Sequence, residues 1–448
     1  MGESGARRIA RRTVLKYAVT GGLLTLLQAC GGGGNSTGTV ATGSGPTTAA
    51  SGGATTTAAK PSTATAAAGS APTTAAIGVT ATRTTTGSSA AGATAGALPT
   101  APSGTAPGGH PAYYPGEYAR VVDAAKKEGK LQIYSIMSAT NWKPVVEGFK
   151  KRYGIDVETV DAGATEVFTR YYAEAGGGAR SADLIITSAP DAWQDFIKRG
   201  ELAEYKSPED PYVPGWSKLA PGVYSASSDP MFFIYNKKLV TGSVPKTLKE
   251  LADAVGKNAD VYKGKLTTYD CAANATGFSN LFFWQKAKGE EGWKILETLG
   301  KNGHKFETSA GNMVNSVLSG EAVFGYFVSA ISVFPKFPAS ESILGYGMIG
   351  DGTPILVRGM GITKKATSPN AAKLMVDYII SQEGQIAFAD GGLTAYRPDV
   401  QEKAKQHLDK LNAGLGEGAL IKYSFDPDMT DKAKTDAALQ RWKQVMGR

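Results

Sequence analysis

The sequence predicts an α/β protein with two lobes, preceded by a targeting segment and a long polar linker. Three observations support this fold class. Short apolar strands alternate with single helices over residues 118–200, which is typical of β-α-β units and a mostly parallel sheet. A similar alternation resumes near residue 231 and continues to about residue 350. The 448 residues also suffice for about two to three compact units, so two lobes fit the length.

Residues 1–30 have the pattern of an export signal. A basic stretch that ends at Arg11-Arg12 precedes an apolar run over 17–27, which is too short to cross a bilayer, since that takes about 20 residues. The arginine pair resembles a twin-arginine signal, and Leu27-Gln28-Ala29-Cys30 resembles a lipoprotein cleavage site. We therefore expect an extracytoplasmic protein that is anchored to the cell membrane by lipid on Cys30. General export, or a cleaved signal with an incidental cysteine, is the alternative.

Residues 31–112 consist almost wholly of Gly, Ala, Thr, Ser and Pro. Such a segment buries too little apolar surface to offset the entropy of ordering, so it is predicted to be a disordered linker. As a flexible coil it would span on the order of 50 Å. A linker of this kind would hold a folded body, over 113–448, clear of the membrane.

Charge and cysteine content exclude several classes of protein. Of the 48 basic and 40 acidic residues, seven bases and one acid lie before residue 113, which leaves 41 bases and 39 acids in the body. The alkaline pI therefore indicates no nucleic-acid surface. Two cysteines and three histidines exclude a disulfide scaffold and a zinc finger or ribbon.

The body is predicted to alternate strands and helices in both lobes. Strands are expected at 130–136, 155–160, 182–187, 231–236 and 354–362, and helices at 141–153, 164–175, 194–200 and 369–380. More than one crossover is expected between the lobes. Lobe 1 is assigned to about 113–230 plus 354–400, lobe 2 to about 231–353, and the C-terminal helices over 401–448 are expected to pack across both.

Five weak motifs, in their order and spacing, resemble one family. They are Gly200-Glu201-Leu202, Phe233-Ile234-Tyr235-Asn236-Lys237, Tyr262-Lys263-Gly264-Lys265, Ser319-Gly320-Glu321-Ala322-Val323, and the pair Ala371-Ala372-Lys373 and Ser381-Gln382-Glu383-Gly384-Gln385. Over roughly 115–400 the chain resembles the extracellular solute-binding proteins of bacterial ABC importers, in the branch with ferric-iron, thiamine, polyamine and phosphonate or sugar-phosphate binders. The resemblance implies a type II periplasmic-binding-protein fold that closes around one small ligand. It also implies a permease and ATPase complex as partner, a monomer, no cofactor and no enzymatic activity.

The candidate site lies in the turns that follow the strands, because ligands of open α/β sheets sit beyond the carboxyl ends of the strands. These turns begin helices, whose free N–H groups attract anions. The candidate ligand-binding residues there are Ser138, Thr140, Asn141, Thr187, Ser188, Thr276, Gly277, Ser309 and Asn312. Arg358 could add a bidentate contact to an anion, and Ser329 completes the set. Helix capping, or for Arg358 an ion pair at the hinge, is the competing interpretation.

Iron and polyamines fit this set of residues less well. Ferric binders of the family carry two adjacent tyrosines after the Ser-Gly-Glu motif, and these places fall here on Ala330 and Ile331. Ser138 stands where an upstream histidine is usual, so no metal site is expected. A polyamine would need acids, and those within plausible range are Asp161, Asp191, Asp229 and Asp270.

We therefore expect a binding protein that captures a small anionic or polyhydroxylated ligand, such as a phosphonate, sugar phosphate or carboxylate. A ferric-iron or polyamine binder of the same fold is the nearest alternative. An exported hydrolase is disfavoured, because the three histidines lie far apart and no Gly-x-Ser-x-Gly elbow is present. A ligand sensor without a transporter stays open, since fold does not fix function.

Overall fold

The structure is a computed structural model that describes residues 98–448, and these residues belong to one compact unit. The predicted export signal, Cys30 and the linker up to residue 97 lie outside the described residues. Within the described part of the chain, no helix is both long enough and apolar enough to cross a membrane.

The first lobe is a parallel sheet covered by helices, as the alternating pattern predicted. Its elements are α1 (Tyr118–Glu128), β1 (Lys130–Ser135), α2 (Ala139–Tyr153), β2 (Asp156–Asp161), α3 (Glu166–Gly176), β3 (Leu184–Thr187) and α4 (Pro190–Lys198). Strand β1 lies between β2 and β3 and is parallel to both. Leu184 and Ile186 pack on one face of the sheet and Ile185 on the other, so this short apolar strand is buried on both sides.

The second lobe repeats this arrangement. It contains α5 (Leu248–Lys257), α6 (Ala259–Tyr262), β7 (Leu266–Tyr269), α7 (Ala275–Gly300), β8 (His304–Glu307), α8 (Ala310–Ser319), β9 (Phe324–Ser329), α9 (Ala330–Val333) and β10 (Leu344–Gly347). Strand β7 lies between β8 and β9 and is parallel to both. The carboxyl ends of these three strands therefore lie at one edge of the sheet.

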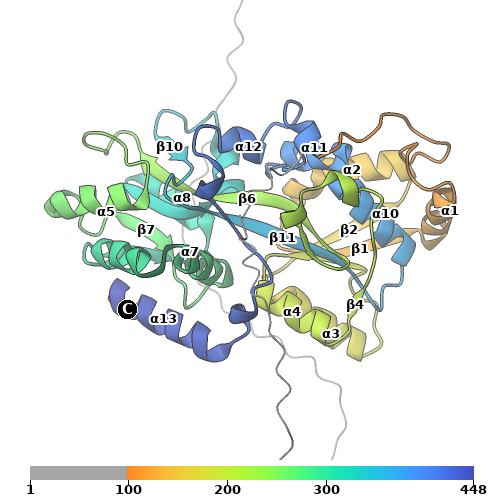
Figure 1. Ribbon diagram of the computed structural model, residues 1–448, viewed down its shortest axis with the longest axis horizontal. Helices are drawn as coiled ribbons and strands as arrows, with labels where there is room; N and C mark the ends of the chain where they lie inside the picture. The colour runs from red at the N-terminus through yellow and green to blue at the C-terminus, as the bar shows by residue number, and fades with distance from the viewer. Residues whose placement is uncertain (1–97) are drawn as a thin grey trace, which may run out of the picture. The chain divides into compact units, whose positions relative to one another are not determined.

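Two long antiparallel strands, β6 (Val223–Asn236) and β11 (Thr353–Thr363), connect the lobes (Figure 1). The first half of β6 pairs with β11, which also pairs with β3, whereas its second half pairs with β9 and β10. The resulting strand order is β2-β1-β3-β11-β6-β9-β7-β8. Sequence analysis placed the start of β6 at Met231, eight residues late, because its first half is the polar run Ser225-Ala226-Ser227-Ser228-Asp229, which is nevertheless buried.

The remaining elements return to both lobes. Helices α10 (Pro369–Ile380) and α11 (Gln382–Asp390) join lobe 1, where α10 lies beside α1 (Figure 1). Two short strands, β4 (Leu202–Ala203) and β12 (Leu420–Lys422), pair with opposite ends of β11, and β5 (Lys218–Ala220) pairs with β6. After α12 (Leu408–Leu411) the chain ends in α13 (Lys432–Met446), which packs against α7 of lobe 2 through an Arg441–Glu290 ion pair.

Residues 98–112, which sequence analysis assigned to the linker, are part of the folded body. The backbone N–H of Ala101 donates to Asp399 Oδ2 at 3.2 Å. His110 is buried, and its ring lies 5.2 Å from that of Tyr118. The sequence of residues 98–112 did not indicate these contacts, because it is as rich in small and polar residues as the linker before it.

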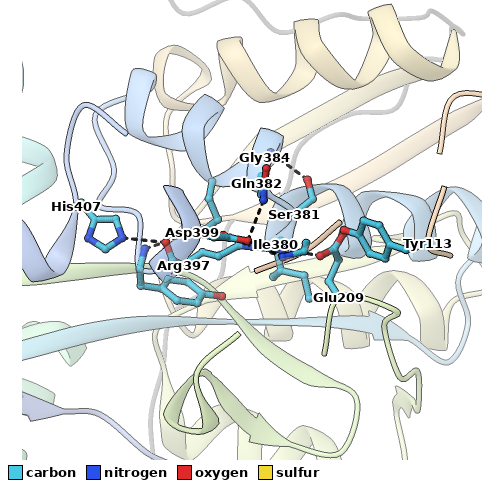
Figure 2. A network of polar contacts seen from close by, with 12 residues as sticks. Tyr113, Glu209, Ile380, Ser381, Gln382, Gly384, Arg397, Asp399 and His407 are labelled. Carbon is cyan, nitrogen blue, oxygen red and sulfur yellow. Dashed lines mark hydrogen bonds and ion pairs between the residues drawn. The ribbon is translucent and has the colours of Figure 1, made fainter. Parts of the chain in front are cut away.

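A buried ionic network fixes this N-terminal segment to lobe 1 (Figure 2). The fully buried Arg397 pairs with Glu209 at 2.5 Å and with Asp399 at 2.7 Å. Glu209 also accepts hydrogen bonds from the hydroxyls of Tyr113 and Tyr114, at 2.5 and 2.7 Å. Because each charge has partners, the desolvation of the group is offset, and removing one member would leave the others uncompensated.

A second buried carboxylate, Asp377 on α10, lies next to this network. It accepts hydrogen bonds from the hydroxyls of Tyr118 and Tyr205. Burial raises the pKa of Asp377 to about 7, with a further upward contribution from the charge of Glu209, although hydrogen bonds from Ser207, Tyr118 and Tyr205 oppose the rise.

Replacing Arg397 with methionine should lower the free energy of unfolding by about 3–5 kcal/mol, because Glu209 and Asp399 would stay buried without a cation. Arg441→Met is the matched control. It removes an exposed ion pair and should cost about 1 kcal/mol or less. Urea unfolding of both variants measures the difference, and equal losses would contradict the stabilising role assigned to the network.

The raised pKa of Asp377 predicts that stability falls as pH rises. The folded protein holds this proton up to about pH 7, whereas the unfolded chain releases it near the ordinary 3.8. The contribution of Asp377 is therefore complete below about pH 4 and is lost by about pH 7, with a slope of at most about 1.4 kcal/mol per pH unit. Asp377→Asn should flatten the dependence of urea unfolding on pH between 5 and 7, and an unchanged slope would refute the shift.

Candidate functional site

A cleft of about 590 Å³ lies between the lobes and is lined by the turns that follow the parallel strands. Lobe 1 contributes Ile136, after β1, and residues 161–165, after β2. Lobe 2 contributes Tyr269 at the end of β7, together with residues from 273–276, 308–311 and 329–332. Leu356 and Arg358 come from the connecting strand β11. The carboxyl ends of the strands of both lobes thus meet at one cleft, as expected for open α/β sheets.

Two helices of lobe 2 begin at this cleft. Asn274 caps α7 by accepting a hydrogen bond from the N–H of Gly277 at 2.7 Å, and Ser309 caps α8 by accepting one from Asn312 at 3.2 Å. Neither helix has an acidic residue in its first turn. The partial positive charge at both N-termini is therefore not offset by a neighbouring carboxylate of the helix itself.

Arg358 forms the ion pair that was the competing interpretation, and it also lines the cleft. Its guanidinium forms an ion pair with Asp229 of β6 and donates to Ser227 Oγ at 2.9 Å. Asp229 also accepts a hydrogen bond from the N–H of Thr394, at 3.2 Å. Arg358 nevertheless lines the cleft, and its buried Nε has no hydrogen-bond partner among residues 98–448. The side chain therefore serves the connecting strands and keeps one donor free.

Ser329 is positioned by an irregularity in β9. The pairing of β9 with β6 shifts register between Phe232 and Ile234, and Phe327 adopts a left-handed backbone with φ of 59°. Such a bulge re-aims the residues that follow it. Ser329 lines the cleft, and its buried hydroxyl has no hydrogen-bond partner in the part of the chain that the structure describes. It is a second buried polar group without an acceptor on the same wall.

Tyr269 is a cleft residue that sequence analysis missed. It is the last residue of β7, so it lies at the carboxyl end of a strand, where ligands of open α/β sheets bind. Burial raises the pKa of Tyr269, and the nearby charge of Arg358 and the backbone N–H of Ala310 oppose the rise. The phenol therefore stays protonated and can donate a hydrogen bond.

The structure brings four predicted residues to the cleft wall: Thr276, Ser309, Ser329 and Arg358. Two others, Gly277 and Asn312, use their backbone N–H groups in the caps of α7 and α8. A side chain at Gly277 would collide with Tyr269, since a Cβ there would lie 2.5 Å from that of the tyrosine. Contact of these six predicted residues with a ligand stays a prediction.

The remaining predicted residues lie in lobe 1 and do not line the cleft. Ser138 donates to Asn141 Oδ1 at 2.7 Å, and the amide of Asn141 donates to the carbonyl of Gly391 at 2.8 Å. Thr140 is exposed in the same turn, and Thr187 donates to the carbonyl of Ala164 at 2.8 Å. The hydroxyl of Ser188 is buried and has no hydrogen-bond partner among the described residues. The turn after β1, which was predicted to contact a ligand, therefore contacts the loop after α11 instead.

The cleft offers few groups for a metal. Ala330 is buried, and Ile331 lines the wall at the places where the sequence resemblance puts tyrosine ligands. Among residues 98–448, no group of three or more His, Cys, Asp or Glu is arranged to hold a metal ion. Tyr269 and Asp161 are the phenol and the carboxylate that line the cleft.

Known proteins share this fold. Iron uptake protein A1 of Synechocystis is 22% identical over 350 residues, which are 73% of this chain and 89% of that protein. The substrate-binding protein of an ABC transporter from Agrobacterium tumefaciens superposes with a TM-score of 0.63 and 22% identity, over 71% of this chain and 94% of that one. A periplasmic binding protein of Actinobacillus pleuropneumoniae, solved with fructose-6-phosphate, gives 0.56 and 20% identity over 71% and 99%.

More than half of the chain, residues 136–386, matches the family described as bacterial extracellular solute-binding protein. The two lobes, their connecting strands and the cleft between them are consistent with that match, and a family of binding proteins implies no catalysis. The chain therefore belongs to the bacterial extracellular solute-binding proteins.

Proposed function

We propose that this protein is the lipid-anchored receptor of an ABC importer, which captures a small anionic or polyhydroxylated solute between its lobes and delivers it to a permease. Phosphonates, sugar phosphates and carboxylates are the ligand classes that fit. The relative from Actinobacillus pleuropneumoniae, which was solved with a sugar phosphate, supports this class by analogy.

The observation that carries the proposal is the pair of unsatisfied donors on the cleft wall. Ser329 Oγ and Arg358 Nε are buried and have no hydrogen-bond partner among the described residues. A buried polar group without a partner costs about 1–3 kcal/mol, and an oxygen-rich ligand would supply the missing acceptors. The N-termini of α7 and α8 at the same wall also favour negative charge.

Capture requires that the ligand binds the closed arrangement of the lobes more tightly than the open one. The lobes share β6 and β11, so changes in these strands can move one lobe relative to the other. A solute that touches the turns of both lobes would stabilise closure. The closed shape is what the permease is proposed to recognise.

Ferric iron is the second candidate, because a relative is named as an iron uptake protein. The cleft supplies Tyr269 and Asp161 as hard oxygen ligands, so a bound anion would have to complete the coordination. A polyamine is less well served. Asp229 is paired with Arg358, Asp270 is paired with Arg448, and Asp191 lies in the first turn of α4, so that only Asp161 faces the cleft.

A thermal-shift screen tests the ligand class. We expect a sugar phosphate or a phosphonate to raise the Tm of ligand-free protein by several degrees, since ligand at 100 times its Kd adds about 2.7 kcal/mol. Ser329→Ala should weaken that ligand about tenfold, because it removes a donor, whereas Ser319→Ala at the opposite end of α8 should not. A shift with ferric citrate or spermidine, and with no anionic organic solute, would overturn the proposed class.

The lipid anchor has its own test. In the bacterial host, Cys30→Ser should release the protein from the membrane fraction into the soluble extracytoplasmic fraction, because no acyl chain could be attached. The mature wild-type chain should begin at Cys30 and carry the mass of a diacylglyceryl group. A soluble wild-type protein, or a start elsewhere, would contradict the anchor.

A further inference from the structure

The wall that lobe 1 presents to the cleft is negative. Asp161, at the carboxyl end of β2, lines the cleft and forms no ion pair or hydrogen bond through its carboxylate with the described residues. Partial burial raises its pKa, as expected for a carboxylate that no cation compensates. Glu166 lies in the first turn of α3, where its carboxylate accepts the N–H of Gly163 at 3.1 Å. This acid offsets the positive end of α3.

The opposite wall is positive. The N-termini of α7 and α8 carry roughly half a charge each and have no acid in their first turns. Beside them lie Ser329 Oγ and Arg358 Nε, which are both buried and have no hydrogen-bond partner within residues 98–448. Asp229 neutralises the full charge of Arg358, so the excess on this wall amounts to about one positive charge from the helix ends.

The cleft is therefore polarised rather than uniformly positive. One unpaired carboxylate stands on the lobe 1 side, and about one compensating charge stands on the lobe 2 side. A dianion without a cationic group would leave Asp161 unpaired. A polyamine would bring its positive charges close to the positive N-termini of two helices. A solute with a cationic group at one end and an anionic group at the other satisfies both walls.

We propose that the solute is dipolar, with an ammonium or similar cationic group against Asp161 and a phosphate, phosphonate or carboxylate against the N-termini of α7 and α8. This inference rests on the proposed function and narrows its ligand class. It also assigns the lobes different tasks, since lobe 2 holds the anionic end and lobe 1 selects the cationic end.

Matched pairs of probes test the inference by titration calorimetry on the ligand-free full chain. The first pair is 2-aminoethylphosphonate and propylphosphonate, and the second is glucosamine 6-phosphate and glucose 6-phosphate. Within at least one pair, the amine should bind at least tenfold more tightly, because a charge-assisted hydrogen bond to Asp161 adds to the same anionic contacts.

Asp161→Asn should abolish this advantage by weakening binding of the amine, whereas the amine-free partner, which makes no bond to the carboxylate, should bind no more weakly than before. Asp156→Asn, at the other end of β2 and outside the cleft, is the matched control and should change neither affinity. Equal binding within both pairs, or an advantage that survives Asp161→Asn, would overturn the dipolar ligand and leave the proposed function intact. Failure of all four probes while ferric citrate or spermidine binds would overturn both.

Discussion

The antiparallel pairing of β6 with β11 is the constraint on which the rest of the structure depends. Strand β11 pairs with β3 of lobe 1, and β6 pairs with β11 over its first half and with β9 and β10 of lobe 2 over its second half. Together the two strands join two parallel sheets into one. Because each sheet is built from β-α-β units, its helices begin at the carboxyl ends of its strands. The connecting strands bring these ends together, so that one cleft receives the helix N-termini of both lobes.

The connecting strands also carry buried polar side chains in the region where they pair with each other. Ser227, Asp229 and Arg358 are buried where a shared sheet would ordinarily carry apolar side chains. The Arg358–Asp229 pair holds one strand to the other, and it cancels charge that would otherwise dominate the cleft. In the proposed dipolar mode of binding, the weaker fields of the helix ends and of Asp161 would then select the solute. On this proposal, the same ion pair joins the connecting strands and sets the charge that a solute would meet.

The fold could be predicted from the sequence because apolar strands and capped helices leave local signals. Strand β3 and helix α10 are examples, since each is a compact apolar run with clear ends. The site was harder, because a serine that caps a helix looks the same as one that binds a ligand. Ser309 lines the cleft whereas Ser138 does not, and only the tertiary position of the loop at Gly391 separates them. The pairing of Arg397 with Glu209, 188 residues earlier in the chain, left no local signal at all.

Backbone hydrogen exchange tests the central claim most directly. The full chain would be measured with and without a saturating amount of the tightest-binding anionic probe. The account predicts that protection rises at residues 273–277 and 308–312, the N-terminal turns of α7 and α8, and at 161–165 across the cleft. Protection that appears only elsewhere, with these three turns unchanged, would contradict ligand capture between the lobes.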